Sequence, residues 1–384
     1  MEDIKSKNKK LFLIAGIILV ILLIVCVVST IFLSNRNKVE EPNIIENEVK
    51  ENEEEVLVYE EPEDNKEEQE VIKDGKVDVI DINSPSRPYM VVVNNTPVAV
   101  KVQEGLNRAY IVYEIPVEFN FSRLLAVYKD VDENLVIGTI RSARHDFIDF
   151  ALENDAIFCC WGWSFIAERQ LRGGITDYLQ GLWGAPFFRG ENKEGIALEH
   201  TAYTSMDGLK EKAISNGFRT TTLNKSLLNY DTDDVDISSS NYAKVANTIV
   251  IPYGEPSSIT TFKYDENSKM YVRYSAGNVC IDYHTKEQVT TKNIIIQKIN
   301  YSVETERNYY WNLNIVGSGE GYFITNGYAV PITWTKTDRG AKTKYTYSSG
   351  VTINGKDVSG EEVIVSDGRT YIELQTNSQI LSIE

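Results

Sequence analysis

The sequence predicts an α+β fold that follows a membrane anchor and an acidic stalk. Residues 11–33 form one uncharged apolar run, and residues 40–70 carry fifteen acidic and two basic side chains. Beyond them, short β-branched and aromatic runs alternate with a few helical stretches. These sequence patterns indicate a transmembrane helix, a disordered acidic linker over 34–79, and folded domains after the linker.

The apolar run is long enough to cross a bilayer. At 1.5 Å per helical residue, the 23 residues cover about 30 Å of hydrocarbon. Four lysines within residues 1–10 outnumber the two basic residues that follow the run, Arg36 and Lys38. By the positive-inside rule, residues 1–10 are a cytoplasmic tail and the bulk of the chain is extracytoplasmic. We therefore expect a single-pass protein of the cell membrane.

Cys26 leaves a second anchoring mode open. A cleaved signal peptide normally has an apolar core of about 7–15 residues that ends in small residues, and this run does not fit that description. A lipidated cysteine normally follows a small residue, whereas Val25 precedes Cys26 and the apolar run continues beyond it. A membrane-buried thiol is the favoured interpretation, and lipidation is the alternative.

Residues 80–230 are expected to form a mixed α/β domain. Runs rich in β-branched and aromatic residues predict strands over 89–95, 110–116, 123–128, 136–140 and 156–163. Apolar residues at helical spacing predict helices over 143–154 and 206–216. Ser142 and Ser205 are the expected N-caps, and Gly217 is the expected end of the second helix.

Residues 240–384 are expected to form a mostly antiparallel β-rich domain. About eleven short strands with frequent turns suggest a β-sandwich or a strongly curved sheet. Asn326-Gly327, Asn354-Gly355 and Asp367-Gly368 stand where hairpins should reverse. This part shows no grouping of acid, base or nucleophile, which favours a scaffold or a binding surface.

Composition excludes several classes of protein. The net charge of -17 gives no basic footprint for nucleic acid, and four cysteines without paired CxxC spacing exclude a disulfide-dense scaffold and a zinc ribbon. We interpret Cys159, Cys160 and Cys280 as reduced core residues. The motifs HExxH, GxSxG, GxxxxGK[ST] and GxGxxG are missing from the sequence, so we expect no metal and no cofactor.

The most informative segment is Arg141-Ser142-Ala143-Arg144-His145. If Ser142 caps a helix, Arg144 and His145 lie in its first turn, where cations are unfavourable unless an anion faces them. One interpretation is a ligand site for a carboxylate or phosphate built from Arg141, Ser142 and Arg144. The other is a partly buried ion pair with Glu114 or Glu118, the more common arrangement for buried arginines.

Glu114 and Glu118 could also be the two carboxylates of a glycan-cleaving enzyme, with His200 assisting. In a straight strand they would lie about 13 Å apart, which exceeds the window of about 5–9.5 Å for glycoside hydrolysis. Pro116 could bend the strand and shorten that distance. The alternative is that both are exposed or salt-bridged strand carboxylates, and that His200 is a hydrogen-bonded structural group.

Flat aromatic residues near cations form a further candidate surface. Trp161 and Trp163, with Arg189, could stack a sugar ring, although two tryptophans two positions apart at a strand end are more often on one core-facing side. We also include Arg123 and His200 among the candidate ligand-binding residues.

Short motifs of the folded part match those of one protein family. They are Arg87-Pro88, Gln103-x-Gly105-Leu106, Ile111-Val112-Tyr113-Glu114, Val117-Glu118, Arg123-x-Leu125-Ala126, Ile140-Arg141-Ser142-Ala143-Arg144, Asp155-Ala156, Glu199-His200-x-x-Tyr203-Thr204-Ser205, Tyr264-Asp265, Tyr271-x-Arg273, Lys292-Asn293-Ile294-Ile295 and Trp334-x-Lys336. Through them the chain resembles the YerB-like family of membrane-associated extracytoplasmic proteins of Gram-positive bacteria, which have a two-part domain of unknown function. The family often has glycines where Phe119 and Asn120 stand, and an Asp-Asn pair in place of Asn94-Asn95.

The topology, the stalk and the lack of enzyme motifs together favour a noncatalytic envelope protein that binds a cell-wall component or a membrane-associated partner. Two alternatives remain open. One is a peptidoglycan-acting hydrolase or lyase that uses Glu118 or Glu114 with His200, and the other is an assembly factor for other envelope proteins. The resemblance implies a location and no activity.

Overall fold

The structure is a computed structural model that describes residues 80–384 except 133, 191–194, 223, 225, 255 and 305–308. The predicted tail, transmembrane helix and acidic linker lie outside the described residues. Within the described part, no helix is both long and apolar enough to span a membrane. By their contacts, the described residues belong to one compact unit.

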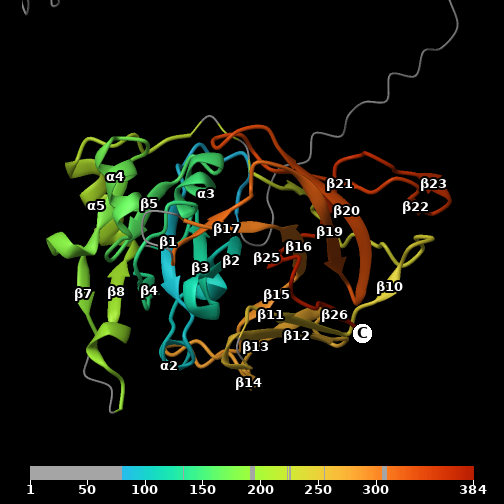
Figure 1. Cartoon of the computed structure of the whole chain (residues 1–384), viewed down its shortest axis with the longest axis horizontal. Helices are drawn as coiled ribbons and strands as arrows, with labels where there is room; N and C mark the ends of the chain where they lie inside the picture. The colour runs from blue at the N-terminus through green and yellow to red at the C-terminus, as the bar shows by residue number, and fades with distance from the viewer. Residues whose placement is uncertain are drawn as a thin grey trace, which may run out of the picture. The chain divides into compact units, whose positions relative to one another are not determined.

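One mixed sheet runs through both halves of the folded part. Its strands are β1 (Tyr89–Asn94), β2 (Ile111–Val117), β3 (Phe121–Tyr128), β5 (Ile157–Cys160), β6 (Tyr178–Gln180), β10 (Lys244–Val245), β16 (Asn293–Ile299), β19 (Gly317–Thr325), β20 (Tyr328–Lys336), β21 (Lys344–Tyr347) and β25 (Thr370–Thr376). Their order is β10-β20-β19-β16-β25-β2-β3-β1-β5-β6, with β21 beside β20. Figure 1 shows the long, curved β19–β20 hairpin on the side of the molecule opposite α4 and α5.

The two halves meet where β25 lies between β2 and β16 and runs parallel to both. Ile111 is opposite Thr370, and Glu114 is opposite Glu373. All seven residues of β25 are buried, as expected for a strand that is paired on both edges and covered on both faces. The segments 80–230 and 240–384 therefore share one sheet.

A second sheet packs on one face of the first. It contains β11 (Thr248–Pro252), β12 (Ile259–Asp265), β13 (Met270–Ser275), β14 (Asn278–Val279), β15 (Thr290–Thr291) and β26 (Ser382–Ile383). Ile251 and Phe262 of this sheet share a core with Val112 and Ile296 of the large sheet. The second half thus contains two sheets packed face to face, as in a β-sandwich.

Few helices accompany these strands, which agrees with an α+β protein. Helices α3 (Phe147–Glu153) and α4 (Phe165–Arg172) cover the other face of the large sheet, and α5 (Met206–Ser215) covers the same face as the second sheet. The remaining short elements are α2 (Pro97–Val100), β4 (Val136–Gly138), β7 (Phe187–Arg189), β8 (Ala202–Ser205), β9 (Asn229–Tyr230), β17 (Tyr301–Val303), β18 (Trp311–Leu313), β22 (Thr352–Ile353), β23 (Lys356–Asp357), β24 (Ile364–Val365) and five single-turn helices at 106–108, 118–120, 181–183, 198–200 and 256–258.

The predicted helix over 143–154 is wrong at its start. Helix α3 begins at Phe147, and Ser142 does not cap it. The segment before the helix is extended because neighbouring strands take its backbone hydrogen bonds: Arg141 N–H donates to Val92 O at 2.9 Å, and Ala143 N–H donates to Gly162 O at 3.0 Å. The second predicted helix is confirmed as α5, which follows Ser205 and precedes Gly217 at φ 72°.

Two of the three predicted hairpin turns are confirmed. Asn326-Gly327 joins β19 to β20, and Asn354-Gly355 joins β22 to β23, with positive φ at all four residues. Asp367-Gly368 instead lies between β24 and β25, which pair with other strands. A Cβ on Gly368 would lie 2.7 Å from Lys292 Cβ, so this glycine permits a close approach of two chain segments.

Trp161 and Trp163 do not share one face. Trp161 packs against the core under the second sheet, and Trp163 packs against the core under α3 and α4. Gly162 at φ 89° interrupts the alternation of the strand and turns the second ring to the other side. The cysteine prediction is confirmed, because Cys159, Cys160 and Cys280 are buried and unpaired.

The hairpin between β2 and β3 explains the glycines that the resemblance led us to expect. Phe119 and Asn120 both have positive φ, at 63° and 57°. Glycine adopts this conformation without strain, whereas a phenylalanine does so at a cost. Phe119 is 69% exposed, and its ring stacks on Tyr309 with centroids 6.2 Å apart.

Candidate anion site at the carboxyl ends of β1 and β5

The candidate site lies where two parallel strands separate. β1 and β5 pair from Tyr89 to Val91, and beyond that point the segment 139–143 comes between them. Ile140 bridges to Val93 of β1, and Ala143 bridges to Trp163 just after β5. Sheets with parallel strands commonly bind ligands at such diverging carboxyl ends.

Four arginines gather around this inserted segment. Arg123 comes from β3, where it is opposite Asn94 of β1, and its guanidinium donates to the carbonyl of Ser142. Arg141 belongs to the inserted segment, Arg144 follows it directly, and Arg189 ends β7. We call Arg123, Arg141, Arg144 and Arg189 the arginine cluster.

Arg144 is the member with a buried ion pair. Its Nε donates to Glu118 Oε1 and Oε2, at 2.9 Å each, and its Nη2 also contacts Oε1. The guanidinium carbon lies 5.1 Å from the centre of the Tyr310 ring. Of the two interpretations of Arg144, the structure thus supports the ion pair, with Glu118 and not Glu114 as its partner.

The same pair determines the protonation of Glu118. Burial alone would raise the pKa of this carboxyl, but the hydrogen bonds and charge of Arg144, together with the charge of Arg123, hold it below its usual range. A general acid must be protonated near neutral pH, and Glu118 is ionised there. This environment suits an ion pair and not proton donation.

Arg141 and Arg189 lie on the more exposed side of the cluster. Arg141 contacts Glu199 at 3.4 Å, and their side chains are 28% and 59% exposed. Arg189 donates to the carbonyl of Leu198 at 2.7 Å, and its guanidinium lies 4.3 Å from the centre of the Trp161 ring. These exposed contacts contribute little to stability, which leaves both cations accessible to a ligand.

His200 is held beneath this surface as a neutral imidazole. Thr96 N–H donates to Asn94 Oδ1, so the Asn94 amide nitrogen faces His200 Nδ1 at 3.0 Å and donates to it. Burial lowers the pKa of His200, Glu199 raises it, and Arg141 lowers it further. His200 Nε2 lies 3.4 Å from Glu199 Oε1. His200 therefore orients Glu199 beside Arg141.

The cluster carries more positive than negative charge. Four guanidinium groups face two carboxylates, Glu118 and Glu199. Within the described part of the chain, no carboxylate lies within 4.0 Å of Arg123. Burial lowers the pKa of Arg123, and the charges of Arg144 and Arg141 lower it further against the opposing effect of Glu118. Because arginine stays protonated in proteins, an anion that approached Arg123 would relieve this repulsion.

Glu114 lies elsewhere, in a buried polar network between the two halves of the chain. Its Oε2 accepts from Arg273 Nη2 at 2.8 Å, and both side chains are fully buried. Its Oε1 accepts from Asn95, Ser122 and Thr260 at 2.7–2.9 Å. With both carboxylate oxygens hydrogen-bonded and no solvent contact, Glu114 is a structural anchor in this arrangement.

Glu373 makes the network dependent on pH. Burial and the charge of Glu114 raise its pKa well above the usual range, while the Tyr253 hydrogen bond and the charge of Arg273 oppose the rise. Two carboxylates and one guanidinium then share a closed volume, so one carboxyl binds a proton in the folded state. This contribution to stability is present at low pH and is lost as pH rises through the folded-state pKa.

We therefore expect Glu373→Gln to become more stabilising, relative to the parent, as pH rises from about 5 to about 8. Urea unfolding of the segment Glu70–Glu384 across this range measures the difference. Glu361→Gln, which changes a half-exposed carboxylate, is the matched control. A difference between Glu373→Gln and the parent that stays constant with pH would contradict the shared proton.

The structure thus divides the predicted site residues. It brings together Arg123, Arg141, Ser142, Arg144, Arg189, His200 and Trp161, with Glu118 as a counter-ion. Ser142 donates from Oγ to Trp161 O at 3.2 Å and so serves the backbone. Trp163 lies apart, edge-on to Trp183 and Tyr178. In the described part of the chain, no three His, Cys, Asp or Glu side chains group as metal ligands do.

Sequence reasoning missed Arg273 and Glu373. One signal was available for the first: β13 alternates buried and part-exposed residues, with Tyr271, Arg273 and Ser275 all on the buried face. A cation at a core-facing strand position requires a buried anion. No comparable signal marks Glu373, because every residue of β25 is buried and alternation is missing.

Comparison with known proteins agrees with this architecture. Residues 77–219 match the N-terminal domain, and residues 249–372 the C-terminal domain, of a family described as protein of unknown function DUF3048. The chain is 29% identical over 256 residues to the putative lipoprotein YerB of Bacillus subtilis (strain 168), across 66% of this chain and 74% of that protein. The crystal structure of YerB from Bacillus subtilis aligns with a TM-score of 0.64 and 26% identity, and covers 79% of this chain and 95% of the solved one.

Proposed function

Because this chain belongs to the YerB-like family of two-part DUF3048 proteins, we propose that it is an envelope protein that binds an anionic group of a cell-wall component through its arginine cluster. The observation that carries this proposal is Arg123, a part-buried guanidinium that faces other arginines and has no carboxylate within ion-pair distance in the described part of the chain.

Location in the envelope is supported by two independent features. The relative YerB is named a putative lipoprotein, and the sequence of this chain has an apolar run over 11–33 followed by an acidic stalk. On this proposal the run tethers the protein as a single-pass span with the folded part extracytoplasmic, and lipidation of Cys26 is the alternative mode of attachment.

The ligand chemistry follows from the donors. Arg123, Arg141 and Arg189 offer guanidinium groups that suit carboxylate or phosphate oxygens, and the ring of Trp161 lies under Arg189. A cell-wall glycan that carries acidic groups would meet both the cations and a flat apolar surface. No catalytic step is part of the proposal, since Glu118 is ionised and paired and Glu114 is fully buried.

The test is co-sedimentation of the full-length chain with insoluble cell wall. Arg123→Gln and Arg141→Gln should each weaken retention about tenfold or more, because a charge-assisted hydrogen bond contributes about 1.5–3 kcal/mol. Arg108→Gln removes one charge from an exposed pair with Asp132 and should leave retention unchanged. Far-UV circular dichroism checks that each variant is folded.

Three outcomes would count against the proposal. Retention equal to the parent in both cluster variants would place the ligand elsewhere. Release of soluble sugar or peptide fragments by the parent, abolished in Glu118→Gln, would favour the hydrolase or lyase. Failure to bind wall, together with co-purification of another membrane protein, would favour the assembly factor.

A further inference from the structure

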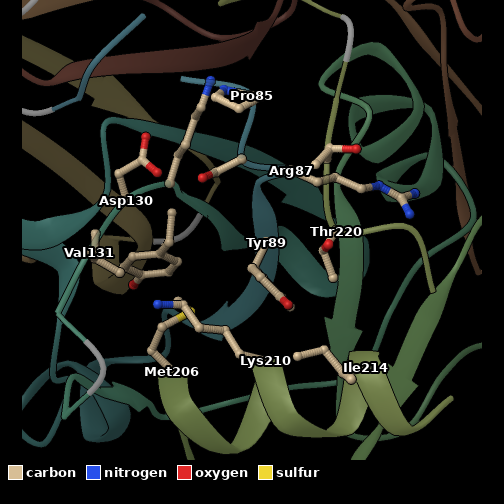
Figure 2. Close-up of a pocket in the computed structure, with 13 residues that line it drawn as sticks. Pro85, Arg87, Tyr89, Asp130, Val131, Met206, Lys210, Ile214 and Thr220 are labelled. Atoms are coloured by element: carbon tan, nitrogen blue, oxygen red, sulfur yellow. The ribbon is translucent and has the colours of Figure 1, made fainter. Parts of the chain in front are cut away.

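A separate cavity of about 330 Å³ lies at the amino-terminal end of β1, whereas the segment that carries Arg141 contacts the carboxyl end of that strand. It is bounded by the segment before β1, the end of β3, helix α5 and residues 220–221, and no residue of the arginine cluster lines it. Figure 2 shows Met206, Lys210 and Ile214 of α5 along one wall and Pro85 and Asp130 toward the other. The volume is at the lower end of the range for small-molecule pockets.

The walls are mainly apolar and come from the core. Tyr89, Tyr128 and Met206 belong to the core under the second sheet, and Val131 joins them from the turn after β3. Ile214 is 66% exposed and lies at the rim. A ligand that fits here therefore needs an apolar body.

Lys129 is the polar group of the lining that indicates a negative charge on the ligand. Only 4% of this residue is exposed, yet its ammonium makes no hydrogen bond and no ion pair with any described residue. Asp130 accepts a hydrogen bond from Ser84 at 3.0 Å instead. Burial lowers the pKa of Lys129, and the more distant charges of Asp130 and Asp81 oppose this. The Lys129 side chain is mostly buried and its ammonium has no partner among the described residues, so an anion in the cavity would supply one.

Two other polar side chains of the lining, Arg87 and Tyr89, differ from Lys129 in their contacts. Arg87 is already paired with Asp177 and donates to Asp155 O, and Figure 2 shows its guanidinium turned away from Lys210 and Asp130. Burial raises the pKa of Tyr89 to about 12, so its hydroxyl stays protonated and can donate. Figure 2 shows that hydroxyl directed toward the α5 side of the cavity.

From the cavity, its apolar walls and the unpartnered ammonium of Lys129, we infer a second binding site for a small monoanion with an apolar body, such as an aryl-substituted or branched carboxylic acid. The carboxylate would contact Lys129, and the apolar body would lie between Tyr89, Met206 and Val131. The inference is independent of the arginine cluster, because the two sites share no residue.

The probes are hydrocinnamate and its neutral amide, hydrocinnamide, which have the same shape. Equilibrium dialysis against the full-length chain should give an affinity for the carboxylate at least about tenfold higher than for the amide, as expected for a charge-assisted contact. Lys129→Met should abolish this preference and keep the weaker binding of the amide. Lys129→Arg should retain the preference, and the exposed Lys212→Met of α5 should behave as the parent.

Several results would overturn the inference. Equal affinity of the parent for the two probes, or binding of neither, does so without any variant, and so does not depend on whether Lys129→Met folds. Persistence of the preference in Lys129→Met does so as well. Loss of carboxylate binding in Arg123→Gln, with normal binding in Lys129→Met, would assign the probe to the arginine cluster. One result would support the inference instead. If Arg123→Gln no longer binds cell wall but still binds hydrocinnamate, the two sites are separate.

Discussion

Replacing Arg273 by methionine should lower the free energy of unfolding by about 3–5 kcal/mol, because it leaves a buried carboxylate without its counter-ion. Arg273 and Glu114 are both fully buried and meet at 2.8 Å. Arg273 also donates to Asn95 Oδ1 at 3.1 Å. Since Arg273 comes from β13 and Glu114 from β2, its loss uncouples the second sheet from the first half of the chain. Urea unfolding of the segment Glu70–Glu384 measures the change.

Two comparisons make this prediction specific. Arg108→Met removes an arginine from an exposed ion pair, and surface pairs contribute at most about 1 kcal/mol. The double variant Arg273→Met with Glu114→Gln should recover much of the lost stability, because no uncompensated charge remains at Glu114. A cost for Arg273→Met no larger than that of Arg108→Met would show that the network does not hold the halves together.

Replacing Lys336 by methionine should have a similar effect, about 3–5 kcal/mol, through a second buried ion pair. Lys336 Nζ lies 2.6 Å from Glu153 Oε2, and both side chains are fully buried. Glu153 also accepts from Tyr113 at 2.9 Å and from the Thr343 hydroxyl at 2.7 Å. The pair connects the end of α3 to the end of β20. Without the lysine, Glu153 remains as a buried charge with neutral donors alone.

The matched control for this pair is Lys356→Met, which removes an exposed lysine from a contact with Glu361. Glu153→Gln combined with Lys336→Met should be more stable than Lys336→Met alone, for the same reason as above. Hydrogen exchange adds a local measurement, since Lys336→Met should increase exchange in α3 more than in α5. Equal increases in exchange in the two helices would indicate a general loss of stability, and would contradict a specific stabilisation of α3 by the ion pair.

Much of the local structure could be predicted because its signals act over a few residues. Asn326-Gly327 and Asn354-Gly355 form hairpins since both residues of each pair adopt positive φ. The boundaries of α5 follow from apolar spacing and from Gly217. Cys159 and Cys160 are buried on opposite faces of the sheet, as strand alternation predicts. The family was also accessible, since short motifs are properties of the sequence itself.

The candidate site was predictable in its residue types and not in its arrangement. Arg141 and Arg144 were expected at a helix entrance in need of a negative partner, but the segment is extended because β1 and the residues after β5 take its backbone bonds. Glu118 was one of two possible partners for Arg144. Nothing local separates it from Glu114, because that choice depends on a hairpin that turns Glu118 toward the inserted segment.

Order along the chain therefore accounts for the strands, the turns and the family, and for the expectation of an anchor and stalk ahead of the fold. Three-dimensional packing accounts for the rest. It pairs β2 with β25, which are separated by more than half the length of the folded part of the sequence. It also places Arg123 among other cations and buries Glu114 together with Arg273. Such contacts join residues far apart in sequence, and their free energy depends on burial and charge that exist only once the sheet has formed.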